Sequence, residues 1–428
     1  MLIDELKEIS NSKSIGIFGA GASGIAACNL LKFMNLKCIV YDEYNESYGY
    51  FSEADLKRHS LIICSPSFLP DHRWVNLAKK HSLRCIPEID LAYIFMKGKF
   101  DRKKKKIVAV TGTNGKTTTT EFLTFLLKNA GYRALACGNI GRPMSDVVLS
   151  EDMVSCDHVI CEVSSFQAAM LSFFSPDILI WTNFYPNHLN KHTSMDEYFN
   201  CKSNLVRMLL SDQFFCGKCV MNFANEKDSL VSKKFNSAIQ CIYNGEQESM
   251  VVETAMATAP NRENFAIAYE FCKKNEIPIK KPVVENFKPP KYRLEFVCKK
   301  CGKFFWNDSK STTFSALNAA LSNFQQKVIW IGGGESKGDA LENILQIIYN
   351  KISYALLIGE TGKGLCELLG KNNIPHKYSS TVDVAVRDSV QQVSDIVLFS
   401  PAFTSFDQFK DYKERGKFFE KCILDLKI

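Results

Sequence analysis

The chain lacks long apolar runs: no stretch approaches the roughly 18 uncharged apolar residues in a row that indicate a membrane-spanning helix, although 46% of its 428 residues are hydrophobic. Its first ten residues, MLIDELKEIS, are acidic and amphipathic, and they lack the basic start and apolar core of a secretory signal. The sequence therefore predicts a cytoplasmic protein without membrane insertion.

The chain also lacks the export signal that would make disulfide bonds the default, although it contains sixteen cysteines. In a reducing compartment these side chains are expected to remain free thiols. Two C-x-x-C pairs, Cys216 with Cys219 and Cys298 with Cys301, could together supply four zinc ligands. The pairs are far apart in the chain and border strand-like segments, and the second resembles a hairpin turn before Gly302. We favour structural thiols over a zinc site.

Strong charge is also missing, because the net charge of +7 is spread over a long chain. The one basic run, RKKKK at residues 102–106, is more often a solvated linker than a nucleic-acid patch. We therefore expect no nucleic-acid partner. The length suggests two or three domains rather than one core.

What the chain does contain is an alternation of buried strand-like and helical segments, typical of α/β proteins with parallel sheets. The basic run and the linker-like FKPPKY separate three such blocks, with boundaries near residues 97 and 288. We predict three domains: a Rossmann-like domain at 1–97, a P-loop-type ATPase domain with a mostly parallel sheet at 98–288, and a second Rossmann-like domain at 289–428.

The first block carries a glycine loop between a strand and a helix, with Gly19, Gly21 and Gly24 in G-x-G-x-x-G spacing. Asp42 follows at the end of the next strand, where an acid can bind a ribose hydroxyl. The glycines allow a pyrophosphate to approach the helix N-terminus. On these residues alone NAD is favoured, but the motif identifies a nucleotide diphosphate and not which one.

The second block contains VTGTNGKTTTTEFL, which is almost a P-loop but has Val110 where the first glycine is usual. Successive backbone N–H groups of Thr113 to Lys116 can form an anion nest, Lys116 can neutralise phosphate charge, and Thr117 can bind Mg²⁺. ATP is the expected nucleotide. The cofactor-binding residues predicted here are Gly112, Thr113, Asn114, Gly115, Lys116 and Thr117.

TGTNGKT resembles the ATP loop of the Mur ligases, a family that includes folylpolyglutamate synthase and whose loop departs from the standard pattern in the same way. Other segments resemble the family in the same order along the whole chain: GNIG (138–141), EVSSFQ (162–167), NFYPNHLNKH (183–192), YRLE (292–295), NDSKSTT (307–313), GGGESKG (332–338) and SPAFTSFDQFKDYKERG (400–416). The last is the most discriminating. The resemblance implies an ATP-dependent ligase of peptidoglycan precursor synthesis, which adds D-glutamate to UDP-N-acetylmuramoyl-L-alanine through an acyl phosphate.

The resemblance also implies two Mg²⁺ sites, with Thr117 and Glu162 at one and His188 and Lys202 at the other. Lys202 would be carbamylated by CO₂, which turns a cation into an anionic oxygen ligand. Lys116, His188 and Lys202 form the expected catalytic set. The alternatives are a salt bridge for Glu162, an ordinary hydrogen bond for His188 and a solvated helix position for Lys202.

Further roles carry over by motif, and the glycine loop then serves UDP rather than NAD. The ATP contacts would be Asn264, Arg293, Asp308 and Lys310. The UDP contacts would be Ser23, Asp42, Ser65 and Asn139. The amino-acid contacts would be Thr312, Lys337, Ser405, Phe406 and Tyr412, with core packing as the alternative role for Phe406 and Tyr412.

Several positions depart from the family pattern: Asn187 and Asn190 replace acids, the usual H-N-x-x-N is reduced to Asn261 and Asn264, and Ser67, Tyr292 and Thr313 replace glycine, histidine and asparagine. The alternatives to the D-glutamate ligase are another Mur-type or folylpolyglutamate-like ligase and a catalytically silent nucleotide-binding regulator. A monomer is the expected state.

Overall fold

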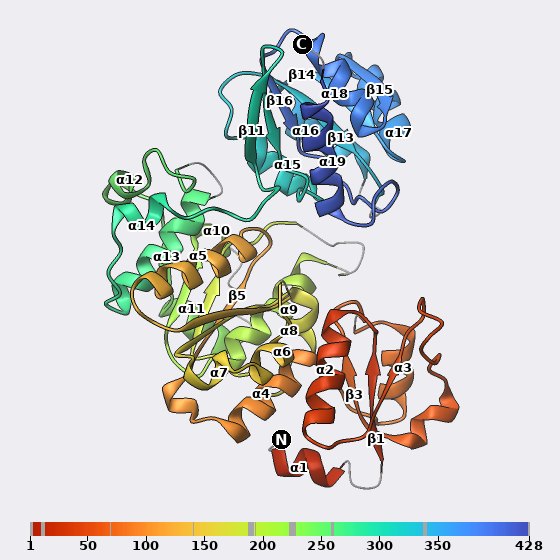
Figure 1. Ribbon diagram of the computed structural model, residues 1–428, viewed down its shortest axis with the longest axis vertical. Coiled ribbons are helices and arrows are strands. Elements are labelled where there is room, and N and C mark those ends of the chain that lie inside the picture. Colours follow the sequence, from red (N-terminus) through yellow and green to blue (C-terminus); the bar gives the residue numbers. More distant parts are fainter. Residues whose placement is uncertain are drawn as a thin grey trace. The chain divides into compact units, whose positions relative to one another are not determined.

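The computed structural model describes residues 3–9, 13–68, 70–139, 141–186, 192, 194–221, 228–257, 261–336 and 340–426. These residues form three sheets with helices packed around them (Figure 1), and all strand pairs but one are parallel. The predicted α/β class is confirmed. Contacts divide the chain into two compact units: residues 1–184, 196–254 and 263–287 form the first, and 185–195, 255–262 and 288–428 form the second.

The first sheet has the strand order β2-β1-β3-β4, and every pair in it is parallel. Its strands are short apolar runs, as expected for strands covered on both faces. The strands are β1 (Ser14–Phe18), β2 (Cys38–Tyr41), β3 (His59–Cys64) and β4 (Cys85–Pro87). The helices are α1 (Ile3–Ile9), α2 (Ala22–Phe33), η1 (Glu53–Arg58), α3 (Arg73–Lys80) and α4 (Glu88–Lys99).

The second sheet belongs to the same unit and has the order β10-β9-β8-β5-β7-β6. Its strands are β5 (Lys106–Thr111), β6 (Ala134–Gly138), β7 (His158–Glu162), β8 (Ile178–Trp181), β9 (Phe214–Gly217) and β10 (Ile239–Cys241). The helices are η2 (Arg102–Lys104), α5 (Lys116–Asn129), α6 (Met144–Leu149), α7 (Asp152–Ser155), α8 (Ser165–Met170), α9 (Met195–Met208), α10 (Lys218–Met221), α11 (Ser229–Asn236), α12 (Gly245–Val251), α13 (Asn261–Lys274) and α14 (Lys281–Glu285).

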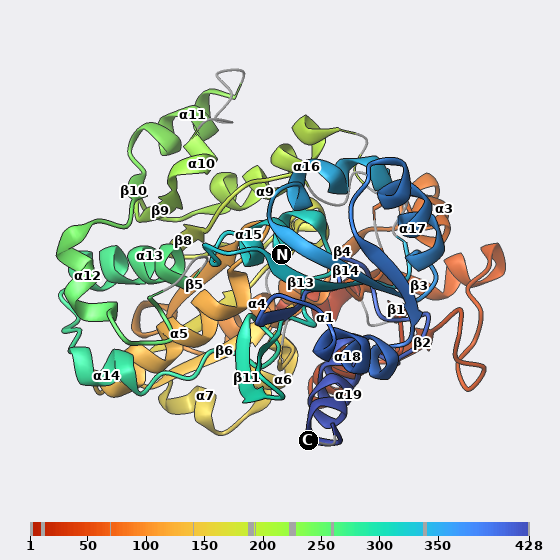
Figure 2. The same cartoon turned by 90° about the horizontal axis from the view of Figure 1, so that it is seen from above.

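The third sheet lies in the second unit and has the order β11-β12-β16-β13-β14-β15. Its strands are β11 (Glu295–Lys300), β12 (Lys303–Asn307), β13 (Val328–Gly333), β14 (Ile352–Ile358), β15 (His376–Ser380) and β16 (Ile396–Phe399). The helices are α15 (Phe314–Leu321), η3 (Leu341–Ile344), α16 (Leu345–Ile348), α17 (Gly362–Lys371), α18 (Val382–Val390) and α19 (Tyr412–Leu424). Helices α18 and α19 lie side by side in both Figure 1 and Figure 2.

The antiparallel pair β11–β12 confirms the hairpin predicted at the second C-x-x-C segment. Cys301 and Gly302 form its turn with φ angles of 48° and 74°. A two-residue turn with positive φ at both positions matches the twist of the flanking strands. The positive φ explains why a glycine stands at position 302. The second cysteine of the C-x-x-C pair, Cys301, is therefore a turn residue.

The basic run at 102–106 is only partly solvated, in contrast to the linker that the sequence suggests. The Lys105 side chain is buried, and its Nζ donates to the carbonyl oxygens of Met153, Val154 and Cys156 at 2.7, 3.0 and 3.0 Å. These carbonyls belong to the end of α7, where a cation is favoured.

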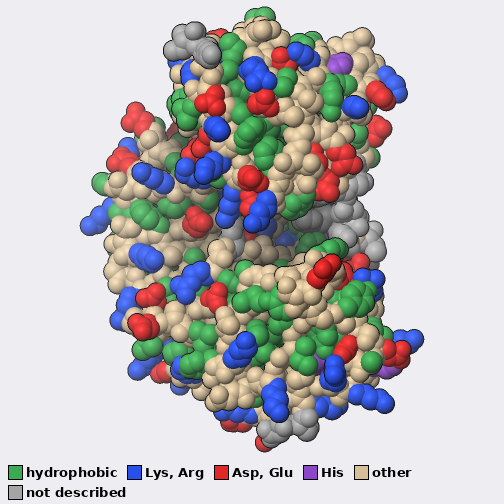
Figure 3. Space-filling model, turned by 45° about the vertical axis from the view of Figure 1, so that its right-hand side comes forward, with side chains coloured by type: hydrophobic (Ala, Val, Ile, Leu, Met, Phe, Trp, Pro, Cys, Tyr) green, Lys and Arg blue, Asp and Glu red, His purple; other side chains and the backbone are tan. Residues whose placement is uncertain are grey.

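On the face drawn in Figure 3, acidic and basic side chains are interspersed. None of the helices in the described part of the chain has the length and apolar composition that a membrane crossing requires.

Candidate active site

The predicted phosphate loop joins β5 to α5, and two of its glycines are required by their surroundings. Gly112 has φ of 145°, and a Cβ there would lie 1.9 Å from Thr182 Oγ1. Gly115 has φ of 79°, and a Cβ there would lie 2.2 Å from Asn264 Oδ1. Any larger residue would therefore meet both strain and collision. The absence of a glycine at Val110 is also explained, since this residue is inside β5 and fully buried.

The loop is held by a residue that the sequence reasoning missed. Asn183, just after β8, accepts from Thr113 N at 3.0 Å through its carbonyl and from Asn114 N at 2.8 Å through Oδ1. Its Nδ2 donates back to Asn114 O at 3.1 Å. The predicted nest of four successive N–H groups is therefore corrected, because two of the four donate to Asn183. The only signal in the sequence was its place in the NFYPNHLNKH segment.

Three of the predicted side chains meet at the end of β7. The buried Glu162 carboxylate accepts from Thr117 Oγ1 at 2.9 Å and from Asn139 Nδ2 at 3.2 Å. Asn139 N also donates to Glu162 O at 2.8 Å. The structure thus brings the two expected ligands of the first Mg²⁺ together. A hydroxyl and a carboxylate are hard oxygen donors and fit that ion.

Lys202 is not the solvated helix lysine of the alternative interpretation, since it is 1% exposed. Its Nζ donates to Gly112 O at 3.0 Å and to Thr111 Oγ1 at 3.3 Å, and it lies 5.0 Å from the centre of the Tyr198 ring. Burial, followed by the charge of Lys116, moves the pKa of Lys202 well below its usual value. A neutral amine at this position is the form that reacts with CO₂. An unmodified ammonium would not fit a metal site, whereas a carbamate would.

Asn264 reaches the phosphate loop from α13. It is 1% exposed, and within the described chain its Nδ2 has no hydrogen-bond acceptor. A buried amide without an acceptor is costly unless a ligand or water completes it. The position of this donor beside Gly115 fits the predicted contact with ATP.

Around the glycine loop of the first sheet, two of the four predicted UDP residues already stabilise the protein itself. Asp42 accepts from Ala20 N, Tyr44 N and Asn45 N at 2.7, 2.9 and 3.0 Å. Partial burial opposes ionisation of Asp42, but these three hydrogen bonds outweigh it and lower its pKa. Ser65 Oγ donates to Gly19 O at 3.3 Å. Ser23 is half-buried in the first turn of α2, and Asn139 is exposed in the loop after β6.

The second unit gathers several predicted ATP and amino-acid residues at the carboxyl ends of β12 and β16. Buried Asp308 accepts from Ser400 Oγ at 2.7 Å and from Leu294 N at 3.0 Å, and burial raises its pKa to about 7. Lys310 Nζ lies 3.8 Å from the centre of the Tyr412 ring. The remaining predicted residues of this unit are partly buried Arg293 and Thr312, buried Ser405 and exposed Phe406.

The two predicted aromatic contacts, Phe406 and Tyr412, differ in their exposure. Phe406 is 66% exposed, so core packing does not account for it. Tyr412 is partly buried at the start of α19, with its ring against the Lys310 ammonium. Exposure therefore speaks against core packing for Phe406, and for Tyr412 both roles remain predictions.

Arg415 is a second residue that the sequence reasoning missed. It is 1% exposed and donates to Ser309 Oγ and Ser309 O at 3.1 and 2.8 Å, and to Phe403 O and Thr404 O at 3.1 and 2.9 Å. Arg415 thereby connects the segment of Asp308 to the segment of Ser405. Its signal was the KDYKERG motif, in which it follows Tyr412 by one helical turn.

Two positions that depart from the family pattern make defined contacts. Thr313 is the N-cap of α15 and accepts from Ala316 N at 3.3 Å. Tyr292 has φ of 65°, and a Cβ at Gly416 would lie 2.5 Å from its ring, so the ring lies directly against α19. His188 and Lys337, as well as Asn187 and Asn190, lie outside the described residues.

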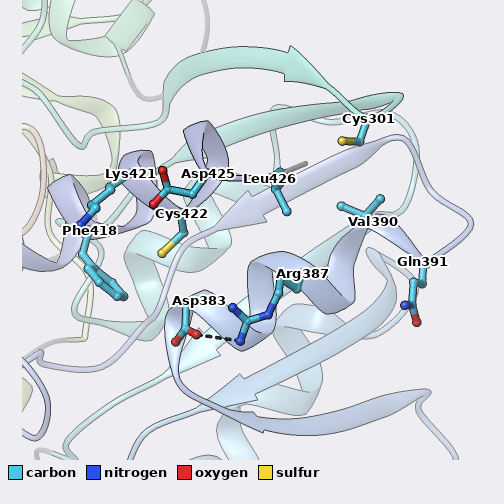
Figure 4. A pocket seen from close by; sticks show the side chains of 10 residues that line it. All are labelled: Cys301, Asp383, Arg387, Val390, Gln391, Phe418, Lys421, Cys422, Asp425 and Leu426. Carbon is cyan, nitrogen blue, oxygen red and sulfur yellow. Dashed lines mark hydrogen bonds and ion pairs between the residues drawn. The ribbon is translucent and has the colours of Figure 1, made fainter. Parts of the chain in front are cut away.

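A pocket of about 570 Å³ lies elsewhere on the second unit (Figure 4). Cys301, Gln391 and Leu426 line it, and they place it toward the amino ends of the strands. Inside it Arg387 forms an ion pair with Asp383 at 2.8 Å. Of the predicted site residues that the structure describes, none lines this pocket, and those of the second unit lie at the opposite, carboxyl ends of its strands.

The chain is similar to known proteins over nearly its whole length. Residues 110–287 match the Mur ligase middle domain. The UDP-N-acetylmuramoylalanine--D-glutamate ligase of Caldanaerobacter subterraneus subsp. tengcongensis is 30% identical, with 99% of this chain and 100% of that protein covered. The enzyme of the same name from Caldicellulosiruptor bescii is 31% identical, with 97% and 98% covered.

Two solved structures share the fold. UDP-N-acetylmuramate-alanine ligase MurC from Thermotoga maritima aligns with a TM-score of 0.57 and 18% identity over 95% of this chain and 98% of its own. MurF ligase from the same organism, in complex with ADP, aligns with a TM-score of 0.57 and 16% identity over 86% and 90%. At these identities the likeness concerns the fold alone.

Proposed function

The chain belongs to the Mur ligase family, and from this membership we propose that it joins D-glutamate to UDP-N-acetylmuramoyl-L-alanine and cleaves ATP to ADP and phosphate. It is an ATP-dependent ligase of peptidoglycan precursor synthesis. The observation that carries the choice of substrates is that relatives named for this reaction match the chain from end to end.

The reaction needs activation because a carboxylate is a poor electrophile. In the proposed sequence, the carboxylate of the UDP-sugar substrate attacks the γ-phosphorus of ATP and displaces ADP. The amine of D-glutamate then attacks the acyl carbon, loses a proton and displaces phosphate, which leaves an amide. Both reactants of the first step are anions, so catalysis depends on positioning and on charge neutralisation.

The residues of the phosphate loop have distinct proposed roles. Lys116 turns from its carbonyl contacts on Gly112 and Thr113, at 3.0 and 2.9 Å, toward the transferring phosphate. Thr117 and Glu162 would hold Mg²⁺, which would supply positive charge to offset that of the ATP phosphates. Asn264 would donate its buried amide to the nucleotide. These roles fit groups that already lie around one loop.

Lys202 has a role that depends on its modification. Its neutral amine would attack CO₂ to form an N–C bond and release one proton, which leaves a carbamate. That anionic oxygen group would serve a second Mg²⁺ together with His188. The support is the deep burial of Lys202 next to the cationic Lys116, since both disfavour a second ammonium.

The two substrate ends are assigned to different parts of the chain. We assign the UDP group to the glycine loop with Ser23, Asp42, Ser65 and Asn139. The D-glutamate carboxylates are assigned to residues of the second unit: Thr312, Lys337, Ser405, Phe406 and Tyr412. The use of ATP favours the cytoplasm as the compartment, and a monomer remains the expected state.

The test is formation of the amide product. The purified protein is incubated with ATP, Mg²⁺, UDP-N-acetylmuramoyl-L-alanine and one amino acid at a time, and the product is identified by mass spectrometry. D-glutamate is expected to give product, whereas L-glutamate, L-alanine and meso-diaminopimelate are not. If only one of the other amino acids gave product, a different ligase of the family would be favoured. If none of the amino acids gave product, a silent nucleotide-binding protein would be favoured.

A further inference from the structure

Helix α6 of the second sheet lies between two helices of the first sheet, α2 and α4 (Figure 1). All three belong to one compact unit. The first turn of α4 carries two acidic residues, Glu88 and Asp90, which are 1% and 0% exposed. Buried carboxylates are rare unless they accept hydrogen bonds. Their partners show what α4 holds in place.

Glu88 caps α6 from outside that helix. The N-cap residue of α6 is Pro143, and it offers no side-chain acceptor to the first turn. Ser145 N, in that turn, donates instead to the Glu88 carboxylate at 2.5 Å. The first N–H groups of a helix have no partner within it, and an acidic group suits that end. Glu88 therefore supplies a cap that the local sequence of α6 lacks.

The capped helix is continuous with the loop that carries Asn139. This loop runs from the end of β6 to α6 and is closed by the hydrogen bond from Gly138 N to Arg142 O at 3.0 Å. At its start, Asn139 is held to Glu162 by its N–H at 2.8 Å and by its side chain at 3.2 Å. One end of the loop is thus fixed on β7 and the other on α4.

We propose that Glu88 is a positioning residue for the ligase reaction, which seats the loop of Asn139 against Glu162 and thereby sets the affinity for the UDP-sugar substrate. The inference rests on the proposed function. Glu88 touches no substrate in this account and acts only through Ser145 and the loop.

Asp90 provides a matched control on the same helix. Its carboxylate accepts from Ser172 N, Phe173 N and Phe174 N at 2.8, 3.1 and 2.7 Å. That segment follows α8 and leads toward β8, away from the loop of Asn139. Asp90 is as buried as Glu88 and has more hydrogen bonds, so a purely structural role would make its loss at least as harmful.

The experiment compares Glu88→Ala and Glu88→Gln with Asp90→Ala and Asp90→Asn in the full chain. Glu88→Ala is expected to raise KM for UDP-N-acetylmuramoyl-L-alanine about tenfold, as for a lost buried acceptor, while KM for D-glutamate changes little. Glu88→Gln should recover most of this loss, because its amide oxygen still accepts from Ser145. The Asp90 variants should melt at a lower temperature with KM values close to wild type.

Hydrogen–deuterium exchange gives a readout that does not need turnover. Glu88→Ala should speed exchange in residues 138–147, and Asp90→Ala should do so only around residues 172–174. An unchanged KM and unchanged exchange at 138–147 in Glu88→Ala would overturn the inference. If wild type made no product, the proposed function would fail, and the exchange pattern would still decide whether Glu88 seats the loop. If Glu88→Ala did not fold, Glu88→Asp would replace it: its shorter side chain withdraws the carboxylate from Ser145, so KM and exchange at 138–147 should rise, and no change in either would overturn the inference.

Discussion

The side-chain nitrogens of Lys116 and Lys202 both donate to the carbonyl oxygen of Gly112, each at a distance of 3.0 Å. Lys116 begins α5, and Lys202 comes from α9, 86 residues later in the sequence. Two ammonium groups on one acceptor repel each other, and Lys202 is the more deeply buried. The carbonyl oxygen of Gly112 thus has one charged lysine beside it, Lys116, and one lysine whose neutral amine is favoured, Lys202.

Lys116→Ala is expected to reduce kcat by a factor of about 10²–10³ or more, because a preorganised cation on the transferring phosphate is lost. Steady-state kinetics at saturating substrates measure this loss. Lys128→Ala, on the exposed end of the same helix, is the control and should behave as wild type. Near-normal kcat in Lys116→Ala would contradict the assignment of the ATP loop.

Lys202→Ala is expected to be severely impaired and to regain part of its activity when acetate or propionate is added. A short carboxylate can occupy the space of the lost carbamate and supply an anionic oxygen. Lys202→Arg should not respond, because the guanidinium stays charged and fills that space. Full activity in Lys202→Ala, with no response to carboxylates, would show that the carbamate is not needed.

Asp42→Ala is expected to raise KM for the UDP-sugar substrate and to leave KM for ATP nearly unchanged. It should also lower the melting temperature, since three backbone N–H groups lose their acceptor. Glu46→Ala, on an exposed position of the following turn, is the control for both measurements. A raised KM for ATP with an unchanged KM for the UDP-sugar would reverse the assigned roles of the two loops.

The pH dependence of stability should differ between wild type and Glu88→Gln. Burial raises the pKa of Glu88 from 4.5 to about 7, so the folded state holds this proton more firmly than the unfolded state. The resulting contribution to stability is present below pH 4.5 and is lost as the pH rises through 7. Its size is on the order of 3 kcal/mol.

Denaturant unfolding between pH 5 and pH 8 measures this difference. Across that range, wild type should lose stability relative to Glu88→Gln, which does not titrate. Glu46→Gln, which removes an exposed carboxylate, should follow wild type. Parallel curves for wild type and Glu88→Gln would mean that the carboxyl group of Glu88 titrates near its ordinary value.

Local sequence patterns could predict the fold class and the two glycine loops. Gly112 and Gly115 stand where the backbone adopts positive φ. Thr117 Oγ1 lies 2.9 Å from Glu162 Oε2 because Thr117 comes after β5 and Glu162 ends β7, the neighbouring parallel strand. Such strands bring their carboxyl ends to one edge, which is a general property of the fold. A motif at a strand end therefore indicates which edge of the sheet carries the candidate site.

The residues that hold the loops in place could not be predicted in the same way. Asn183, Arg415 and Glu88 act through backbone groups of segments that are distant in the sequence. Almost every residue offers a backbone N–H and C=O, so the type of the partner residue does not indicate which side chain binds it. The anion nest was overestimated for this reason, because the sequence does not reveal that Asn183 takes two of its donors.

Phosphate release from ATP tests the central claim most directly. It is measured with both UDP-N-acetylmuramoyl-L-alanine and D-glutamate, with each alone and with neither. The account predicts sustained release only when both are present, and loss of that release in Lys116→Ala. Equal release without D-glutamate, or release supported by L-alanine or meso-diaminopimelate in its place, would contradict the assignment of this chain as the D-glutamate ligase.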